Sequence, residues 1–268
     1  MSNLKTAVVC IARLEGKYLQ EFFECYKSLG FTNVIFCDNN QDGDNEDVQA
    51  ILKPYEGFVI YEDYRNKVGY QMRCYSSIYV KYGNEYDALL FCDIDEQLAL
   101  NKHANISEFL NDFPQDWEQI LINWKCFNDN DLVYYEDKPL KERFTQPIPF
   151  GKCIQYQNIP EDMHVKCIVK GGLPQVIFYS NPHVTTNPLV TYNASGRRCN
   201  NSPFQPIDWS VAQLNHYVCK TVEEWCEKLH KGTGDRNYET FLQTYKNRFF
   251  GYCTPTQEKI EYMQKHGF

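Results

Sequence analysis

The chain has 268 residues, of which 27 are basic and 35 are acidic, giving a formal net charge of −8. Hydrophobic residues make up 43% and charged residues 23% of the sequence, which is typical of a globular protein and excludes wholesale disorder. The acidic balance argues against a general nucleic-acid binder, which needs lysine and arginine to replace phosphate counterions. An anionic substrate would therefore need a local site made from a metal ion, a helix N-terminus or a few basic side chains.

Residues 1–100 alternate between strand and helix patterns. Continuous apolar runs with β-branched residues predict buried strands at 7–12, 34–37, 58–61 and 88–92. Apolar residues at helical spacing predict the helices that connect these strands, at 15–29, 47–52 and 71–82. Strands separated by helices indicate an α/β fold with a mainly parallel sheet. Because ligands of such sheets gather at the carboxyl ends of the strands, we expect functional residues just after positions 12, 37, 61 and 92.

The rest of the chain is more mixed. Residues 120–124 predict another strand, which leads into the polar loop 128–131. Strand-like and loop-like segments alternate from about 150 to 205. Helical patterns then occupy the last part of the chain, at 221–231, 238–249 and 255–266. We find no repeat, low-complexity tract or linker, so we expect one domain that ends in a helical tail.

The twelve cysteines indicate a reducing compartment. The closest pair, Cys219 and Cys226, is seven residues apart, so the sequence contains no C-x-x-C motif of a zinc ribbon or a thioredoxin. Others, such as Cys10, Cys37 and Cys92, lie in apolar runs, where cysteine packs as a small hydrophobic residue. The sequence also lacks a secretory signal pattern and an apolar run of 18 residues. We therefore expect a cytoplasmic protein with at most peripheral association with the inner membrane.

Asp93 and Asp95 are the sharpest chemical feature of the sequence. They follow the apolar run 88–92, and on an extended chain both side chains leave the same face, roughly 7 Å apart. Two carboxylates this close repel each other unless a cation joins them. Mn²⁺ or Mg²⁺ would accept both as oxygen ligands and keep positions open for substrate phosphates. The alternative is a solvated acidic turn, but the position at the carboxyl edge of a parallel sheet favours a metal site.

Four blocks of sequence resemble the GT-A nucleotide-sugar glycosyltransferases, in particular the bacterial family-2-like and family-92-like group. The blocks are Arg13-Leu-Glu15 with Asp38-Asn-Asn40, Gln71 with Phe91-Cys-Asp-Ile-Asp-Glu96, Trp124 with Phe127-Asn-Asp-Asn130, and Leu214-Asn-His-Tyr217 with Lys220-Thr-Val-Glu-Glu224 and Lys228…Lys231-Gly232. The last block is the most specific. The chain departs from the family pattern at Leu14, Tyr26 and Gln97, where asparagine, histidine and phenylalanine are usual.

The resemblance implies a GT-A fold, with a Rossmann-like, mainly parallel sheet, flanking helices and a helical C-terminal region. It implies a single domain, 1–268, with a nucleotide-binding half at 1–100, an acceptor and catalytic half at 101–220 and the helical tail at 221–268. The implied reaction moves a hexose, for which we expect galactose or glucose, from a UDP-sugar to a hydroxyl of a bacterial surface glycan such as lipopolysaccharide or capsule. We expect inversion at the anomeric carbon, a glycan or glycolipid acceptor and no nucleic-acid partner.

The resemblance also implies roles for single residues. The residues expected to bind the nucleotide are Arg13, Glu15, Asp38, Gln71, Asp93 and Lys220. The expected ligands of Mn²⁺ or Mg²⁺, which would neutralise the diphosphate leaving group, are Asp93, Asp95 and His216. The expected general base is Asp129, with Asp131 and Glu96 as alternatives. Structural roles remain open for several of them: an Asx turn at Asp38, a helix N-terminus at Arg13 and Glu15, a core histidine at His216 and a surface lysine at Lys220.

Other residues are weaker candidates. Trp124 would stack on an acceptor sugar or lie in the core, and Lys166 and Lys170 would reach a phosphate. We favour structural roles for His164 and His183.

Two other functions remain as alternatives. A sugar-nucleotide nucleotidyltransferase would need a glycine-rich phosphate loop after the first strand, and residues 11–16 do not supply one. A sugar-binding module without turnover would keep its glycan affinity when Asp93 and Asp95 are replaced by alanine, whereas an enzyme would lose its turnover.

Overall fold

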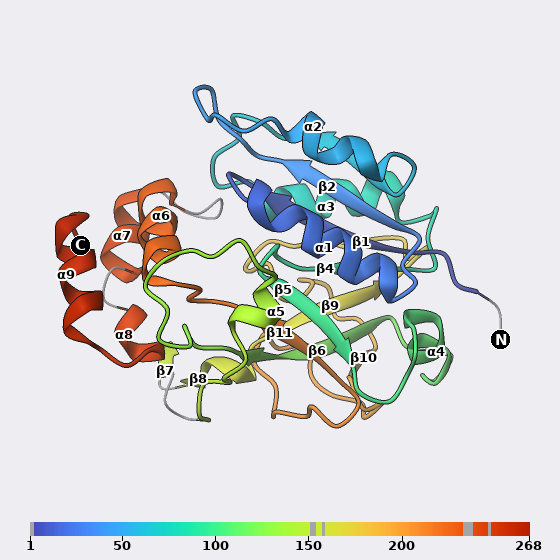
Figure 1. Ribbon diagram of the computed structural model, residues 1–268. Helices are drawn as coiled ribbons and strands as arrows, with labels where there is room; N and C mark the ends of the chain where they lie inside the picture. Colours follow the sequence, from blue (N-terminus) through green and yellow to red (C-terminus); the bar gives the residue numbers. More distant parts are fainter. Residues whose placement is uncertain (1–2, 151–153, 157–158, 233–237, 246–247) are drawn as a thin grey trace.

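The computed structural model describes residues 3–150, 154–156, 159–232, 238–245 and 248–268. In these residues the fold is built on one nine-stranded mixed sheet with the order β3-β2-β1-β4-β9-β6-β11-β5, and β10 pairs with β6 (Figure 1). The strands are β1 Thr6–Ala12, β2 Asn33–Asp38, β3 Val59–Asp63, β4 Ala88–Phe91, β5 Glu96–Leu100, β6 Gln119–Cys126, β9 Val165–Lys170, β10 Thr191–Asn193 and β11 Ala212–His216. A separate hairpin joins β7 Ile154–Tyr156 to β8 Ile159–Pro160.

Seven described strands of the sheet run in the same direction, including β10, which is parallel to β6, so their carboxyl ends face one edge. β1 runs parallel to β2 and β4, and β2 runs parallel to β3. β9 is antiparallel to both β4 and β6, so β6 and its parallel partner β11 point the same way as the first four strands. The prediction of a mainly parallel α/β sheet with flanking helices is confirmed. The shared edge is where ligands of such sheets bind.

The two main connecting helices cover opposite faces of the sheet. Val8 of β1 lies in the same buried cluster as Phe22 of α1, and the next residue, Val9, lies in the cluster of Tyr75 of α3. Successive side chains of a strand point to opposite faces, so both faces of β1 are buried, and this explains its continuous apolar run. The helices of this half are α1 Gly16–Ser28, α2 Val48–Leu52, η1 Lys53–Tyr55, α3 Gln71–Tyr82 and α4 Ile106–Asn111.

The predicted elements of residues 1–100 are confirmed to within two residues at each end. The predicted strand at 120–124 is β6, and the predicted helices at 221–231 and 255–266 are α6 Val222–Lys231 and α9 Gln257–Lys265. The helix expected at 238–249 is instead α7 Tyr238–Tyr245 and α8 Phe249–Tyr252, with 246–247 outside the described residues. Two shorter helices complete the set, α5 Leu140–Arg143 and η2 Glu161–Met163.

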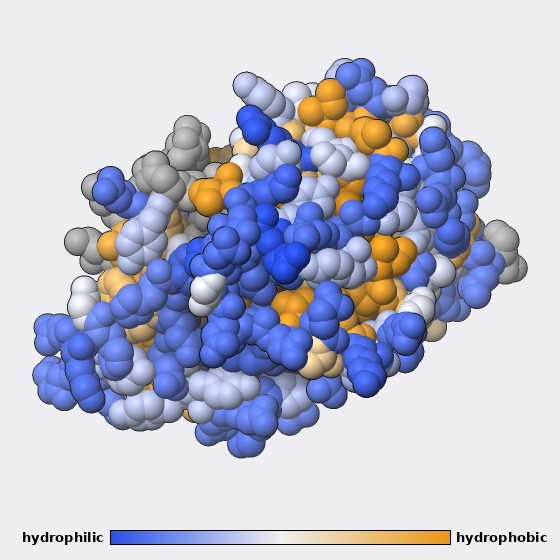
Figure 2. All heavy atoms as spheres, turned by 90° about the horizontal axis from the view of Figure 1, so that it is seen from above, coloured by the Kyte–Doolittle hydropathy of each residue, from blue (hydrophilic) through white to orange (hydrophobic). Residues whose placement is uncertain are grey.

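Helices α6 to α9 gather at one end of the molecule, far from the N-terminus (Figure 1). No helix in the described part of the chain is long and apolar enough to cross a membrane. The face seen in Figure 2 is largely hydrophilic, and its hydrophobic residues form separate small patches.

Candidate functional site

A cavity of about 740 Å³ lies at the edge of the sheet where the strand ends meet. Its wall contains residues that follow β1, β2 and β4, which are Arg13, Asn39 and Asp93, and the last residue of β11, His216. Residues that follow β3 do not line it. Three of the four predicted strand ends therefore contribute to one cavity.

The Asp93 carboxylate is held by one polar side chain from α3 and one from β9. The Gln71 side chain donates a hydrogen bond of 2.7 Å to one carboxylate oxygen, and the Lys166 ammonium donates one of 2.8 Å to the other. The Lys166 side chain is fully buried in β9 and also lies 3.7 Å from the Glu96 carboxylate. Burial alone would lower the pKa of Lys166, but the charge of Asp93 raises it above its usual value. Lys166 therefore stays charged behind Asp93.

Asp95 meets two lysines and one histidine. The ammonium groups of Lys220 and Lys228 lie 3.2 and 3.5 Å from its Oδ2, and His216 Nε2 lies 3.8 Å from its Oδ1. Burial alone would raise the pKa of Asp95, but the charges of Lys220 and Lys228 hold it well below its usual value. The backbone N–H of Tyr217 also donates to the Asp95 carbonyl, which ties this turn to the end of β11. Asp95 is thus a fixed, ionised carboxylate.

Two of the three expected metal ligands, Asp95 and His216, face each other across 3.8 Å. Burial lowers the pKa of His216 to about 3, so its imidazole is neutral and able to bind a metal. Both side chains could contact one divalent ion, because metal–oxygen distances for Mg²⁺ are about 2.1 Å. Asp93 is turned to Lys166 instead. Among the residues that the structure describes, no three or more histidine, cysteine, aspartate or glutamate side chains are grouped to hold a metal ion.

The most specific sequence motif, around Lys220, fixes the start of α6. Thr221 and Glu224 form a capping box, in which the Thr221 hydroxyl accepts from the Glu224 N–H and the Glu224 carboxylate accepts from the Thr221 N–H. The buried Arg143 guanidinium also pairs with Glu224, at 2.8 and 3.0 Å. Lys220 itself has a φ of 56°, in the left-handed region that few L-residues adopt. The threonine and glutamate of the motif thus position α6, and through it Lys220 and Lys228.

Arg13 and Glu15 line the cavity, but both are engaged by other parts of the chain. Arg13 makes two hydrogen bonds to Asp44, at 2.7 and 3.0 Å, and donates to the carbonyl of Lys231. The Lys231 ammonium pairs with Glu15 and donates to the carbonyl of Arg13. Together these contacts join the loop after β1 to the C-terminal end of α6.

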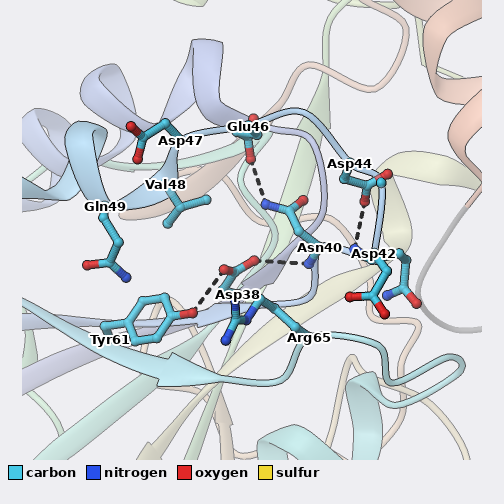
Figure 3. A pocket seen from close by; sticks show the side chains of 12 residues that line it. Asp38, Asn40, Asp42, Asp44, Glu46, Asp47, Val48, Gln49, Tyr61 and Arg65 are labelled. Atoms are coloured by element: carbon cyan, nitrogen blue, oxygen red, sulfur yellow. Dashed lines mark hydrogen bonds between the residues drawn. The ribbon is translucent and has the colours of Figure 1, made fainter.

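Asp38 lies in a second, smaller pocket of about 300 Å³ (Figure 3). One carboxylate oxygen accepts from the Asn40 N–H at 2.9 Å, which is an Asx turn, and the other accepts from the Tyr61 hydroxyl at 3.0 Å. Figure 3 shows Asp38 between these two partners, with Glu46 on the far side of Asn40. The structure does not bring Asp38 into the cavity of Asp93 and Asp95, although its neighbour Asn39 lines that cavity.

None of the three residues expected as general base lines the cavity. Asp129 and Asp131, in the loop after β6, both pair with the buried Lys259 ammonium of α9, at 2.5 and 2.9 Å. Glu96 is fully buried beneath Asp93, where its carboxylate accepts from the Asp93 N–H at 2.9 Å. Burial raises the pKa of Glu96 well above its usual value, which favours the neutral acid.

Aromatic rings form another part of the cavity wall. Trp124 stacks on His164 with ring centroids 5.0 Å apart and also contacts His183 and His216. Burial lowers the pKa of His164 to about 4 and that of His183 well below its usual value, so both rings are neutral. The cavity therefore has a charged region at Asp95 and an uncharged aromatic region at Trp124.

Two residues of the cavity wall, Lys228 and Glu161, were given no role from the sequence. Lys228 lies within a motif that the resemblance singled out, but only the fold of α6 shows that its ammonium reaches Asp95. Glu161 lies outside the four blocks that resemble the family pattern, and it reaches the cavity through η2. No local signal marks a carboxylate of this kind, since its setting depends on contacts with α8.

Comparison with known protein families places the chain in one family. The family described as Glycosyltransferase family 92 matches residues 5–249. The match covers nearly the whole sequence, including all eleven strands and α6. The chain therefore belongs to glycosyltransferase family 92. No curated protein matches it significantly.

Similar solved structures include crystal structures of S. aureus TarS. TarS 1–349 in complex with UDP-GlcNAc has a TM-score of 0.42 and 12% identity, with 98% of this chain and 79% of that chain covered. A second structure of TarS has a TM-score of 0.43 and 11% identity, with 94% and 44% covered. TarS 1–349 in complex with UDP has a TM-score of 0.36 and 16% identity, with 49% and 38% covered. The chain thus spans less than half the length of two of these structures.

Proposed function

We propose that this member of glycosyltransferase family 92 uses the cavity at Asp93 and Asp95 to bind a nucleoside-diphosphate sugar, and that it transfers the sugar to an acceptor hydroxyl. The observation that carries the proposal is the gathering of charged side chains at the strand ends, where Lys166, Lys220 and Lys228 meet the two aspartates. These lysines place positive charge beside the cavity in a chain whose net charge is −8.

Lys228 is the member of this group best placed for a phosphate. Its side chain is 21% exposed and lines the cavity, whereas the Lys166 side chain is fully buried behind Asp93. The charge of Asp95 raises the pKa of Lys228 although burial opposes this, so its ammonium is charged. A diphosphate in the cavity would compete with Asp95 for this ammonium and form a charge-assisted hydrogen bond.

Asp95 and His216 would hold Mn²⁺ or Mg²⁺ in this site. A carboxylate and a neutral imidazole suit these ions, and the remaining ligand positions would be left to water and to the phosphate oxygens of the substrate. When bound, the metal would supply positive charge to the departing diphosphate. Asp93, turned to Gln71 and Lys166, would then form the second carboxylate of the wall, beside the sugar or the ribose.

The aromatic region would receive the sugars. Trp124 and His164 present stacked, neutral rings, and such faces pack against the C–H groups of a pyranose. The family resemblance supports a hexose donor, UDP-galactose or UDP-glucose, an acceptor on a bacterial surface glycan such as lipopolysaccharide or capsule, and inversion at the anomeric carbon. Such an acceptor would be lipid-linked and would be met by a cytoplasmic enzyme at the inner membrane.

A donor-hydrolysis screen tests this proposal. UDP release from UDP-galactose, UDP-glucose and other nucleotide sugars would be measured with Mn²⁺ present and with Mn²⁺ removed by a chelator. We expect turnover of at least one UDP-hexose that depends on the metal, and a rise in melting temperature when UDP and Mn²⁺ are added together. No turnover and no thermal shift with any nucleotide would contradict the proposal. Glycan binding without turnover would indicate a sugar-binding module.

Lys228→Met provides a sharper test of the phosphate contact. We expect the dissociation constant of UDP to rise about 10-fold, the effect of losing one charge-assisted hydrogen bond of about 1.4 kcal/mol. Lys265→Met is the matched control, because Lys265 is exposed on α9 and lies outside the cavity wall. Titration calorimetry with UDP and Mn²⁺ measures both. If the two variants bound UDP with equal affinity, Lys228 would not contact the phosphate.

A further inference from the structure

Among the described residues, four carboxylates line the cavity, and three of them are each paired with a lysine. Glu15 pairs with Lys231, Asp93 with Lys166, and Asp95 with Lys220 and Lys228. Glu161 is the exception. Within the described residues no lysine or arginine lies within ion-pair distance of it, and its nearest such partner is the His164 ring, whose Nδ1 lies 3.5 Å from Oε2.

The Glu161 carboxylate is buried but only half satisfied. Its side chain is 8% exposed, and its Oε1 accepts a hydrogen bond of 3.2 Å from the Tyr252 hydroxyl of α8. Its Oε2 is buried and has no hydrogen-bond partner in the part of the chain that the structure describes. A buried carboxylate oxygen without a donor is unfavourable, so such an atom in a cavity wall indicates a place for a proton or for a donor from a ligand. A sugar hydroxyl is such a donor.

The surroundings of Glu161 leave it a moderately strong base. Burial raises its pKa to about 7, Asp162 adds to this rise, and the charges of Arg248 and Lys228 and the hydroxyl of Tyr252 oppose it. The neighbouring His164 is neutral and so does not act as a cationic partner. A general base works best when its pKa lies near the working pH, because it is then ionised and still able to hold a proton. The other carboxylates of the wall are instead neutralised by lysines.

Glu161 lies beside the aromatic part of the cavity wall. Trp124 contacts both His164, which lies next to Glu161, and His216, which faces Asp95. A sugar packed against these rings would therefore lie in the cavity that Glu161 and Asp95 both line. Direct displacement at a sugar carbon needs the attacking hydroxyl and the leaving group on different sides of that carbon, so the base and the diphosphate site must both reach the sugar.

We propose that Glu161 is the general base of sugar transfer, with its Oε2 accepting the proton of the acceptor hydroxyl. As the proton moves to Glu161, the hydroxyl oxygen forms a bond to the anomeric carbon of the donor. The bond from that carbon to the diphosphate oxygen breaks, and its electron pair leaves with the diphosphate. This assignment rests on the transfer reaction proposed above, and Tyr252 holds the base through Oε1.

The test compares Glu161→Gln with the wild-type enzyme and with Glu258→Gln, a control on the exposed first turn of α9. UDP release from UDP-galactose and UDP-glucose is the probe, with water as the surrogate acceptor. We expect Glu161→Gln to lower kcat by about 100-fold or more, with the dissociation constant of UDP changed less than about twofold. Glu161→Asp should recover part of kcat. The wild-type kcat should rise with pH through an apparent pKa near 7, a step that Glu161→Gln lacks.

The possible outcomes separate the two proposals. A wild-type enzyme that turns over a donor while Glu161→Gln keeps more than about a tenth of kcat would overturn the role of Glu161 and leave the proposed function intact. A variant that loses UDP affinity together with kcat would indicate a structural role and would also overturn it. A wild-type protein that neither binds UDP nor releases it from any donor would overturn the proposed function and this assignment with it.

Discussion

Two of the D-x-D aspartate pairs in the chain closely follow buried strands of the sheet, and they have different roles in the structure. Asp93 and Asp95 follow β4, Asp129 and Asp131 follow β6, and both strands end at the same edge of the sheet. Both pairs meet lysines from the C-terminal third of the chain. The first pair lines the cavity, whereas the second pair binds Lys259 and fixes α9 to the loop after β6. The D-x-D spacing at a strand end therefore does not by itself specify catalysis.

Matched substitutions at the two pairs should give the largest difference. We expect Asp95→Asn to lower kcat for UDP release by about 1,000-fold, because it removes a charged group from the expected metal and diphosphate site. Asp129→Asn should leave kcat within about threefold, since Asp129 does not touch the cavity. Steady-state kinetics with one donor measures both variants. A loss of kcat in Asp129→Asn as large as in Asp95→Asn would show that the two pairs do not differ as described.

The second pair should instead govern stability. Lys259→Met leaves the Asp129 carboxylate buried without its partner, and we expect the free energy of unfolding to fall by about 3 kcal/mol. Urea denaturation followed by circular dichroism measures the change. The exposed Lys265 of the same helix is the control, and Lys265→Met should stay within about 0.5 kcal/mol of the wild type. If both variants unfold at the same urea concentration, the buried ion pair does not stabilise α9.

Glu161 extends the comparison to a carboxylate that pairs with no lysine of the described residues. Its pKa is raised from 4.5 to about 7, so the folded state loses stability relative to the unfolded chain as pH rises from 4.5 through 7. Glu161→Gln removes this penalty, and we expect it to be about 2 kcal/mol more stable than the wild type at pH 8. The two proteins should be equally stable near pH 4.5. Chemical denaturation at both pH values measures the difference, and a difference that does not change with pH would contradict the raised pKa.

The smallest expected change in stability is at Leu14, where the chain departs from the family pattern. Leu14 has a φ of 52°, in the left-handed region, and belongs to neither hydrophobic cluster. Asparagine, the usual residue of the family at this place, adopts this region more readily than leucine. We expect Leu14→Asn to raise the free energy of unfolding by about 0.5–1 kcal/mol. Thermal unfolding of the variant beside the wild type would show a higher melting temperature, and a lower one would mean that Leu14 packs in a way that compensates for its backbone.

The sequence predicted the first half of the fold well because its signals are local. The apolar runs of β1 and β4 are buried on both faces, and the helical spacing around Phe22 faces one hydrophobic cluster, so short segments carried enough information. The position of Asp93 and Asp95 at a ligand-binding edge followed from the same topology. The helix expected at 238–249 corresponds to α7 and the start of α8, and the described Arg248 between them lies in a turn.

The partners of the site residues could not be predicted, since each lies far away in the sequence. Lys166 reaches Asp93 across 73 positions, and Lys220 reaches Asp95 across 125. Asp129 was expected to be the base because it follows a parallel strand. No local pattern in the sequence shows that Asp129 forms an ion pair with Lys259. Glu161 carries no motif at all, and its character depends on burial beneath α8.

One measurement tests the central claim most directly. UDP release from UDP-galactose and UDP-glucose would be followed in the wild type, Asp95→Asn and Asp129→Asn, each with Mn²⁺ and with a chelator. The structure leads us to expect metal-dependent turnover in the wild type and in Asp129→Asn, and none above background in Asp95→Asn. Turnover that survives in Asp95→Asn, or that is lost equally in both variants, would contradict the assignment of the cavity at Asp93 and Asp95 as the site of sugar transfer.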